Sequence, residues 1–133
     1  METVLVTGAA GTVGNYVVGL AEAAGFSVVA SDLNARALRQ PLRGRAVGGD
    51  LNDPSVRKKA REGVDLVVHT AALLDSMADS GALSRVNTEL RVNLFEDAAR
   101  ARVKRVVHMS TCMLYAPNQG RSLSEDADTS ARG

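Results

Sequence analysis

Three glycines near the start of the chain are the residues whose spacing most directly implies chemistry. Gly8, Gly11 and Gly14 follow the strand-forming run Thr3–Thr7 and precede an apolar helical pattern. Glycine is needed where φ is positive or where a side chain would block the approach of a ligand. The free N–H groups and the dipole at the start of the following helix favour an anion there. The turn therefore predicts a phosphate-binding loop, and a purely structural glycine turn is the alternative.

A carboxylate at the end of the next strand-like run extends this site. Asp32 follows the segment Phe26–Ser31 and stands about 20 residues beyond the glycines. An acid in this position accepts hydrogen bonds from the adenosine ribose of NAD and repels the 2′-phosphate of NADP. The same side chain could instead cap a helix that begins near Asn34. Arg36 and Arg39 follow closely and could hold a 2′-phosphate, so the sequence favours NAD and makes NADP the less expected cofactor.

Composition and charge narrow the class of protein. The chain has 133 residues, 45% of them apolar, which is enough for one buried core. Its 16 Lys and Arg residues are interspersed with 15 Asp and Glu residues, so it lacks the basic surface of a nucleic-acid binder. The single cysteine, Cys112, excludes an internal disulfide, and no segment has the pattern of a signal peptide or a membrane span. We expect a cytoplasmic protein with no metal site and no nucleic-acid or membrane partner.

Extended and helical patterns alternate along the chain in the order βαβαβαβαβ. This order predicts an α/β fold, a Rossmann-type doubly wound parallel sheet truncated after about five strands. The expected strands are Thr3–Thr7, a run ending at Asp32, Arg45–Val47, Val64–His69 and Arg105–Met109. The expected helices are Thr12–Ala24, Asn34–Arg39, one with Asp53 as N-cap and Pro54 as first residue, and a long one over Gly81–Ala101. The long helix should bury one face, formed by Leu83, Val86, Leu90, Leu94 and Ala98.

The end of the chain differs from the rest. Periodicity stops after Tyr115, and residues 118–133 are polar and rich in glycine and serine. We therefore expect residues 1–117 to form a dinucleotide-binding domain and residues 118–133 to form a loop or tail. The fifth expected strand brings Thr111 to the carboxyl edge of the sheet, where open α/β sheets bind their ligands.

These landmarks resemble, in order and spacing, the extended branch of the short-chain dehydrogenases, the NAD-dependent sugar epimerase/dehydratase family. The resemblance extends from Thr3 to about Asp126. Four features carry it: the T-G-x-x-G-x-x-G turn, the pair Asp50-Leu51, the H-x-A-A segment His69–Ala72 and the run Val103–Thr111. In the family, the acidic and apolar pair lies against the adenine, and the small alanines let the backbone approach the cofactor. The resemblance implies cofactor contacts from Gly8, Gly11, Thr12, Val13, Gly14, Asp32, Asp50, Leu51, Ala71 and Ala72.

Three further residues gain possible roles from this resemblance. Thr111 matches the catalytic Ser/Thr, whose hydroxyl would bond the substrate oxygen, although a threonine hydroxyl can also bond local backbone. Asn87 lies in a partly kept N-V-x-G-T-x-N-L segment and either supports the active-site strand or is solvated. His69 lies near the groove between cofactor and substrate in the family, and a structural histidine is the alternative.

One family feature does not occur in these 133 residues. The enzymes use a Tyr-x-x-x-Lys pair, because a tyrosine with its ordinary pKa near 10 needs a neighbouring cation to act at neutral pH. Tyr16 is followed four residues on by Leu20, and Tyr115 by Gln119. We therefore expect the NAD-binding part of an epimerase, dehydratase or dehydrogenase for a sugar-nucleotide-like secondary alcohol, inactive alone, with residues 118–133 leading to the absent catalytic helix.

The expected partners follow from that interpretation. They are a dinucleotide, a small-molecule substrate in a full-length parent protein, and a second copy of the chain in a homodimer. A non-catalytic NAD(H)-binding regulatory or sensor module is the alternative function, because it would need the glycine turn and Asp32 but not the Tyr-x-x-x-Lys pair.

Overall fold

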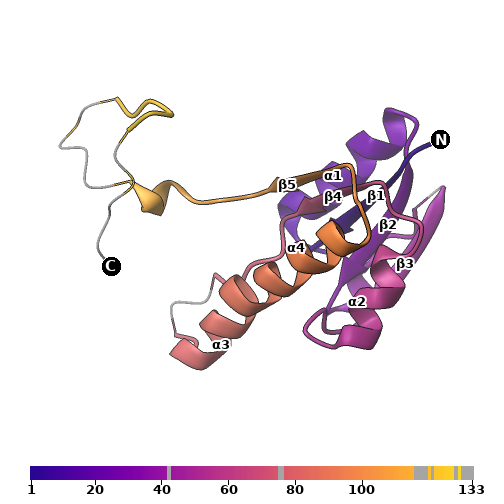
Figure 1. Ribbon diagram of the computed structural model, residues 1–133, viewed down its shortest axis with the longest axis horizontal. Coiled ribbons are helices and arrows are strands. Elements are labelled where there is room, and N and C mark those ends of the chain that lie inside the picture. Colours follow the sequence, from indigo (N-terminus) through magenta and orange to yellow (C-terminus); the bar gives the residue numbers. More distant parts are fainter. Residues whose placement is uncertain (42, 75–76, 116–119, 121, 128, 130–133) are drawn as a thin grey trace.

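Five parallel strands form one sheet in the order β3-β2-β1-β4-β5 (Figure 1). The computed structural model describes residues 1–41, 43–74, 77–115, 120, 122–127 and 129. The strands are β1 (Thr3–Thr7), β2 (Ser27–Asp32), β3 (Gly44–Gly48), β4 (Leu66–His69) and β5 (Arg105–His108). The helices are α1 (Thr12–Ala23), α2 (Pro54–Arg61), α3 (Ser80–Ser84) and α4 (Leu90–Arg100), with 3₁₀ turns η1 (Ala35–Ala37) and η3 (Cys112–Leu114) and a π-helical turn η2 (Arg85–Glu89).

The sheet is doubly wound, so the predicted Rossmann-type fold is confirmed. The chain moves outward from β1 to β3 and then crosses to β4 on the other side of β1. Parallel pairing places Thr7 level with Ser31 of β2 and with His69 of β4. The carboxyl ends of these strands therefore meet at one edge, beside the point where the strand order reverses, which is where such sheets bind ligands.

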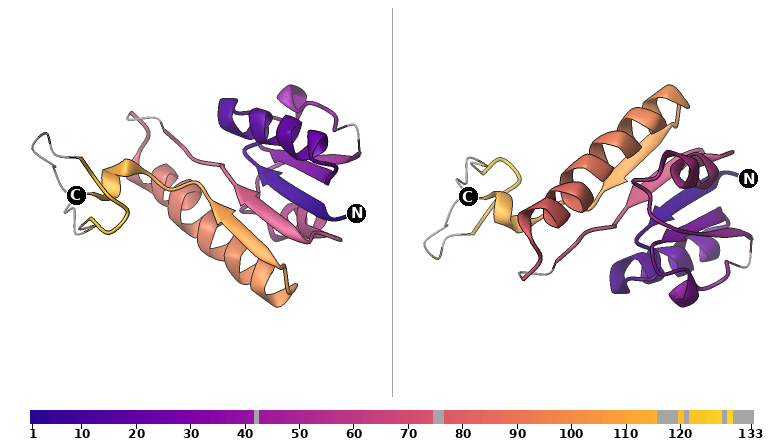
Figure 2. Two further views of the ribbon diagram at one scale, coloured as in Figure 1. Left: turned by 90° about the horizontal axis from the view of Figure 1, so that it is seen from above. Right: turned by 90° about the horizontal axis from the view of Figure 1, so that it is seen from below.

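Alternation along β1 divides the core into two layers. Val4 and Val6 belong to the cluster that includes Val18 of α1. Leu5, between them, belongs to the opposite cluster, which includes Ala60 of α2 and Leu94 of α4. Figure 2 shows α1 and α4 on opposite sides of the sheet. Because a strand points successive side chains to opposite faces, helices on both faces are what the nearly all-apolar strands require.

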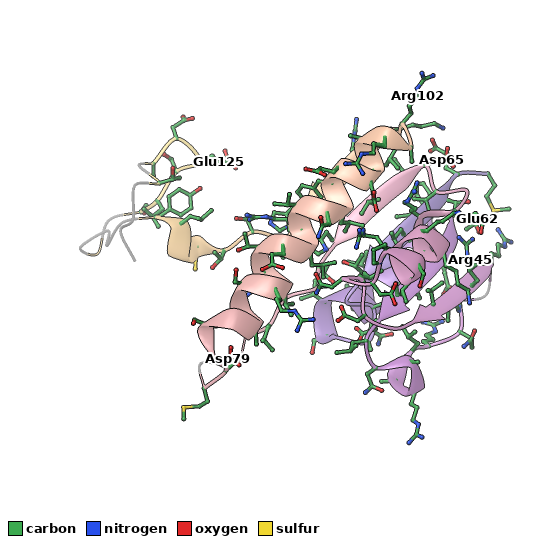
Figure 3. The ribbon with its side chains drawn as sticks, turned by 60° about the horizontal axis from the view of Figure 1, so that its bottom comes forward. Arg45, Glu62, Asp65, Asp79, Arg102 and Glu125 are labelled. Carbon is green, nitrogen blue, oxygen red and sulfur yellow. The ribbon has the colours of Figure 1, made fainter. Side chains whose placement is uncertain are left out.

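Polar contacts at both ends hold α2, which leads from β3 back to β4. The predicted N-cap is confirmed: Asp53 Oδ1 accepts a hydrogen bond from Ser55 N at 2.7 Å, and Pro54 is the first helical residue. At the other end, Arg45 of β3 donates to the carbonyls of Lys59, at 3.2 Å, and Glu62, at 2.5 Å. Figure 3 shows Arg45 and Glu62 side by side there, and Asp79 at the start of α3.

The long helix predicted over residues 81–101 differs most from expectation. It is interrupted by the π-helical turn η2, so the element is α3, η2 and α4 in series. Leu90, Leu94 and Ala98 are buried as predicted, whereas Leu83 and Val86 are only half-buried. A π turn winds more residues into one turn than an α-helix does, which shifts the helical face. Leu83 before the turn and Val86 within it therefore fall out of line with the three residues after it.

Other differences from the predicted elements are small. The third strand extends one residue further at each end than expected, the fourth begins two residues later, and the fifth ends one residue earlier. The turn η3 falls in a stretch that was not predicted to be helical. The predicted boundary between residues 117 and 118 falls outside the described residues. Within the described part of the chain, no helix has the length and apolar character needed to cross a membrane.

Candidate functional site

A pocket of about 310 Å³ lies at the carboxyl ends of the central strands. Seven of the residues predicted to contact the cofactor line it: Gly8, Gly11, Asp32, Asp50, Leu51, Ala71 and Ala72. Thr12, Val13, Gly14 and Thr111, also predicted site residues, are not among the lining residues. The pocket thus joins the turn after β1, the end of β2, the turn after β3 and the segment after β4.

Two of the three glycines are required by the close approach of neighbouring backbone. Gly8 has φ of 68°, and a Cβ there would lie 2.7 Å from the Ala71 nitrogen after β4. A Cβ on Gly14 would lie 2.1 Å from the Gly8 carbonyl oxygen, far inside contact distance. Gly14 is buried and does not line the pocket. Its absent side chain lets α1 pack on the turn, so its structural role differs from that of Gly11.

Gly11 is the glycine that leaves space for a ligand. It is exposed, its φ of −72° is open to any residue, and a Cβ would meet only the Gly8 oxygen, at 3.2 Å. It is also the N-cap of α1, where no side chain caps the helix and no acid occupies the first turn. By contrast, α2 and α3 have capping aspartates at Asp53 and Asp79. The N–H groups at the start of α1 thus have no side-chain acceptor, and a phosphate can supply one.

Asp32 is fixed beside this turn by two backbone N–H groups. Its Oδ2 accepts from Ala10 N at 3.0 Å, and its Oδ1 accepts from Asn34 N at 2.9 Å. The second bond is a local turn contact and not the helix cap considered from the sequence, because η1 begins at Ala35 with Asn34 as its N-cap. The first bond ties β2 to the glycine turn. A carboxylate has about four acceptor positions, so two remain for hydroxyl donors in the pocket.

The two arginines after β2 do not share one environment. Arg39 forms an ion pair with Glu22 of α1, with Nη2 3.3 Å from Oε2, and its guanidinium lies near Gly19 in the middle of that helix. Arg36 lies in η1 and is exposed. The contact to Glu22 directs Arg39 toward α1, which weakens the case for Arg39 as a 2′-phosphate ligand.

The turn after β3 forms the wall opposite the glycines. Asp50 Oδ1 accepts from Asn52 N at 2.8 Å, and Asp50 Oδ2 lies 3.7 Å from the Arg85 guanidinium of η2. Leu51 is 5% exposed and belongs to the core cluster beneath the pocket. The carboxylate of Asp50 is thus the charged group of this turn, and its orientation depends on the turn that carries it.

The segment after β4 is held by an asparagine from the π-helical turn. Asn87 Oδ1 accepts from Leu73 N at 2.8 Å, and Asn87 Nδ2 donates to Leu73 O at 2.9 Å. One amide therefore satisfies both backbone groups of a residue that lines the pocket. Of the two roles considered for Asn87, this is a supporting contact to the backbone after β4, made where the helix departs from α geometry.

His69 lies beneath the site and is buried, with 1% of its surface exposed. Its Nδ1 is 2.6 Å from Thr7 Oγ1, and its ring stacks on His108 of β5 at a centroid distance of 5.3 Å. The Thr7 hydroxyl also accepts a hydrogen bond from Ala71 N at 3.4 Å. Burial, followed by the charges of His108 and Arg91, lowers the pKa of His69 to about 4. His69 is therefore a neutral structural residue that joins β1 to β4.

Thr111 lies in an exposed segment between β5 and η3. Its carbonyl accepts a hydrogen bond from Leu114 N at 3.3 Å. Figure 1 shows this segment leaving the sheet and running away from β5. Among the described residues, no group of three or more His, Cys, Asp or Glu side chains is arranged to hold a metal ion.

Sequence reasoning missed several residues of the site. Leu33, Gly49, Asn52, Thr70, Leu73 and Val86 also line the pocket. Arg57 of α2 was missed as well, and it is 7% exposed. The sequence offers only a weak signal for Arg57, which lies three residues before the apolar Ala60 and so shares its side of the helix.

Comparison with known proteins shows the family of the chain. The model of the NAD dependent epimerase/dehydratase family matches residues 4–132. A 4-hydroxy-2-methyl-3-oxo-4-farnesyl-3,4-dihydroquinoline-1-oxide ketoreductase from Stigmatella aurantiaca is 31% identical over 120 residues, which are 89% of this chain and 35% of the ketoreductase.

Two solved structures are similar over nearly the whole chain. A short-chain dehydrogenase/reductase superfamily protein from Agrobacterium tumefaciens with bound NAD has a TM-score of 0.83 and 32% identity, covering 99% of this chain and 40% of that protein. MoeE5 in complex with UDP-glucose and NAD has a TM-score of 0.81 and 30% identity, covering 96% of this chain and 42% of MoeE5. The chain thus spans well under half the length of these relatives. Its fold and its matching residues confirm the resemblance: the chain belongs to the NAD dependent epimerase/dehydratase family.

Proposed function

We propose that this chain binds NAD in the pocket between the glycine turn and the turn after β3, as the cofactor-binding part of an NAD-dependent oxidoreductase or epimerase. The observation that carries the proposal is the pairing of an uncapped α1 N-terminus at Gly11 with the fixed carboxylate of Asp32. The first would bind the pyrophosphate and the second the adenosine ribose. Asp50 would lie against the adenine, and the small residues Ala71 and Ala72 would admit the rest of the dinucleotide.

The proposed substrate is a secondary alcohol, or its ketone, on a sugar nucleotide or similar molecule. Two findings support this class: MoeE5 was solved with UDP-glucose, and a ketoreductase is among the relatives. NAD would supply hydride acceptance and donation. Thr111 would orient the substrate oxygen, but a threonine hydroxyl is far too weak a base to take its proton. His69 is buried and bonded to Thr7, so it does not replace the base. We therefore expect these 133 residues to bind NAD without turnover.

A test of the binding site compares two glycine variants of α1 by calorimetry with NAD⁺. Gly11→Val places a side chain in the pyrophosphate space of an exposed position, so we expect a folded protein whose NAD affinity is lower by at least about a hundredfold. Gly19→Ala is the matched control, because its Cβ would make only an ordinary 3.6 Å contact with Arg39. Unchanged affinity in Gly11→Val, or an unmodified chain that fails to bind NAD⁺, would contradict the proposed site.

The same protein tests the expected lack of turnover. NADH absorbance is followed with UDP- and dTDP-sugars, and no rate above background is expected. A measurable rate would require a base other than the Tyr-x-x-x-Lys pair. Binding without turnover in every longer product of the gene would instead favour the regulatory or sensor role.

A further inference from the structure

We propose that Arg57 is a positioning residue that sets how well the pocket distinguishes adenine from other bases. The inference rests on the proposed function, because it assumes that the adenine of NAD lies against the turn after β3. It adds to that function a residue that lies outside the pocket lining and makes the turn rigid.

The Arg57 guanidinium binds the carboxyl-terminal part of that turn from beneath. Its Nη1 donates to the Leu51 carbonyl at 2.7 Å and lies 3.3 Å from the Asn52 carbonyl. Its Nε donates to Asp97 Oδ2 of α4 at 2.7 Å. The side chains of Arg57 and Asp97 are 9% and 14% exposed. A single buried cation thus joins α2, the pocket turn and α4.

These bonds determine which groups of the turn face the pocket. The carbonyls of Leu51 and Asn52 point to Arg57, while the Asn52 N–H points back to the Asp50 carboxylate at 2.8 Å. Without the guanidinium, the buried Leu51 carbonyl would lose its charged donor, and a buried unpaired acceptor is unfavourable enough to move the backbone. Any such movement would carry Asp50 with it.

Arginine suits this position better than lysine. The planar guanidinium presents donors in several fixed directions, so it can reach a carboxylate and two carbonyls together. A lysine ammonium at the same position carries its three donors on one nitrogen at the end of a flexible chain, so it cannot span both α4 and the turn in the same geometry. Arg57→Lys should therefore retain the charge and lose much of the positioning.

The preference of the pocket for adenine over another base distinguishes a positioning role of Arg57 from a general loss of stability. The exocyclic amine of adenine can donate to the Asp50 carboxylate, whereas hypoxanthine presents an oxygen acceptor at the same place. We expect the unmodified chain to bind NAD⁺ about tenfold more tightly than nicotinamide hypoxanthine dinucleotide, because the second ligand places an acceptor oxygen, in place of the amine donor, against the Asp50 carboxylate. A general loss of stability would weaken binding of both ligands equally.

The experiment titrates both dinucleotides by calorimetry into the 133-residue chain and four variants. Arg57→Met should reduce the preference for NAD⁺ to about unity, and Arg57→Lys should give a value between those of Arg57→Met and the unmodified chain. Asp50→Asn is the positive control and should also remove most of the preference. Arg100→Met is the matched control, because it removes an exposed arginine 3.4 Å from Asp97 Oδ1 without touching the turn. Thermal melting confirms that each variant is folded, and Arg57→Lys alone decides the question if Arg57→Met does not fold.

Three outcomes would overturn the proposal. In the first, Arg57→Lys and Arg57→Met keep the full preference while Asp50→Asn loses it. In the second, both ligands weaken by the same factor, which makes Arg57 merely structural. In the third, NAD⁺ binds but Asp50→Asn leaves the preference unchanged, which moves the adenine away from this turn. Failure of the unmodified chain to bind NAD⁺ at all would instead reject the proposed function itself.

Discussion

The middle strands of the sheet and its β5 edge differ in how well helices and loops cover them. β1 and β2 lie in the middle of the sheet, with four consecutive buried residues in each. β5 forms one edge, and none of its residues is fully buried. Val107 in this strand is 51% exposed, and Met109 just beyond it is 55% exposed. Residues of similar apolar character therefore have opposite environments in strands of one sheet.

The difference separates the part of the molecule that holds the proposed cofactor from the part that would meet a substrate. The glycine turn and Asp32 stand on the covered strands, and their hydrogen bonds are made within these residues. Thr111 stands beyond the exposed strand. A cofactor site needs rigid support, which the covered strands supply, whereas the segment that carries Thr111 is exposed.

The largest expected effect is a loss of stability, which we compare for one side-chain truncation in β1 and one in β5. Leu5→Ala removes a fully buried side chain from β1 and should lower the free energy of unfolding by about 2–5 kcal/mol. Val107→Ala removes a half-exposed side chain from β5 and should lower it by less than about 0.5 kcal/mol. Urea titration followed by circular dichroism measures both. A loss at Val107 equal to that at Leu5 would show that β5 is covered in solution.

The next effect is a loss of stability at acid pH, which arises where β4 pairs with β5. The pKa of His69 is about 4 in the folded chain, below its ordinary value of 6.5. Below pH 6.5 His69 therefore takes up a proton in the unfolded chain, whereas in the folded chain it does so only near pH 4. The contribution of His69 to the free energy of unfolding is thus fully present above pH 6.5 and is lost as the pH falls toward 4. The loss should be roughly 3 kcal/mol.

Proton NMR of the His69 ring measures its titration midpoint directly, and urea titrations across this pH range measure the stability. His69→Leu should give a flatter dependence of stability on pH between 6.5 and 4. His108 also has a lowered pKa, mainly from burial and also from the Arg91 charge, and it remains in this variant as an internal reference. A midpoint near 6.5 for His69 would contradict the buried stack.

The smallest expected effect is a preference for NAD over NADP, and it tests whether Asp32, at the end of β2, is enough to select the cofactor. A carboxylate near a 2′-phosphate opposes it by up to about 4 kcal/mol at 4 Å and an effective dielectric near 20. Solvent screening reduces this, so we expect NAD to bind about ten- to a hundredfold more tightly than NADP. Asp32→Ala should remove the preference without unfolding the chain.

Arg39→Met is the matched control, because the contact of Arg39 with Glu22 directs it toward α1. It should leave NADP affinity unchanged. Calorimetry with both cofactors decides, and equal dissociation constants for the unmodified chain would refute the role of Asp32. A large fall in NADP affinity in Arg39→Met would show that Arg39 turns toward the cofactor.

Much of the fold could be predicted because its signals are local. The strand run before Gly8, the Asp53-Pro54 start of α2 and the apolar face of α4 depend on neighbours within about four residues. The observed bounds of β1 agree with the prediction at both ends. The π-helical turn was missed because it arises where Asn87 contacts Leu73, a residue 14 positions earlier that only the fold brings close.

The order of the elements, the family and the residue types at the carboxyl edge of the sheet could all be read from the sequence alone. The tertiary structure shows the surroundings of each of those residues. It divided the glycines into Gly14, which admits backbone packing, and Gly11, which faces the pocket. It buried His69 against Thr7 and placed Arg57 beneath the pocket turn. The physical reason is that periodicity and capping act through short separations along the chain, whereas burial and long-range hydrogen bonds depend on which strands and helices the sheet order makes neighbours.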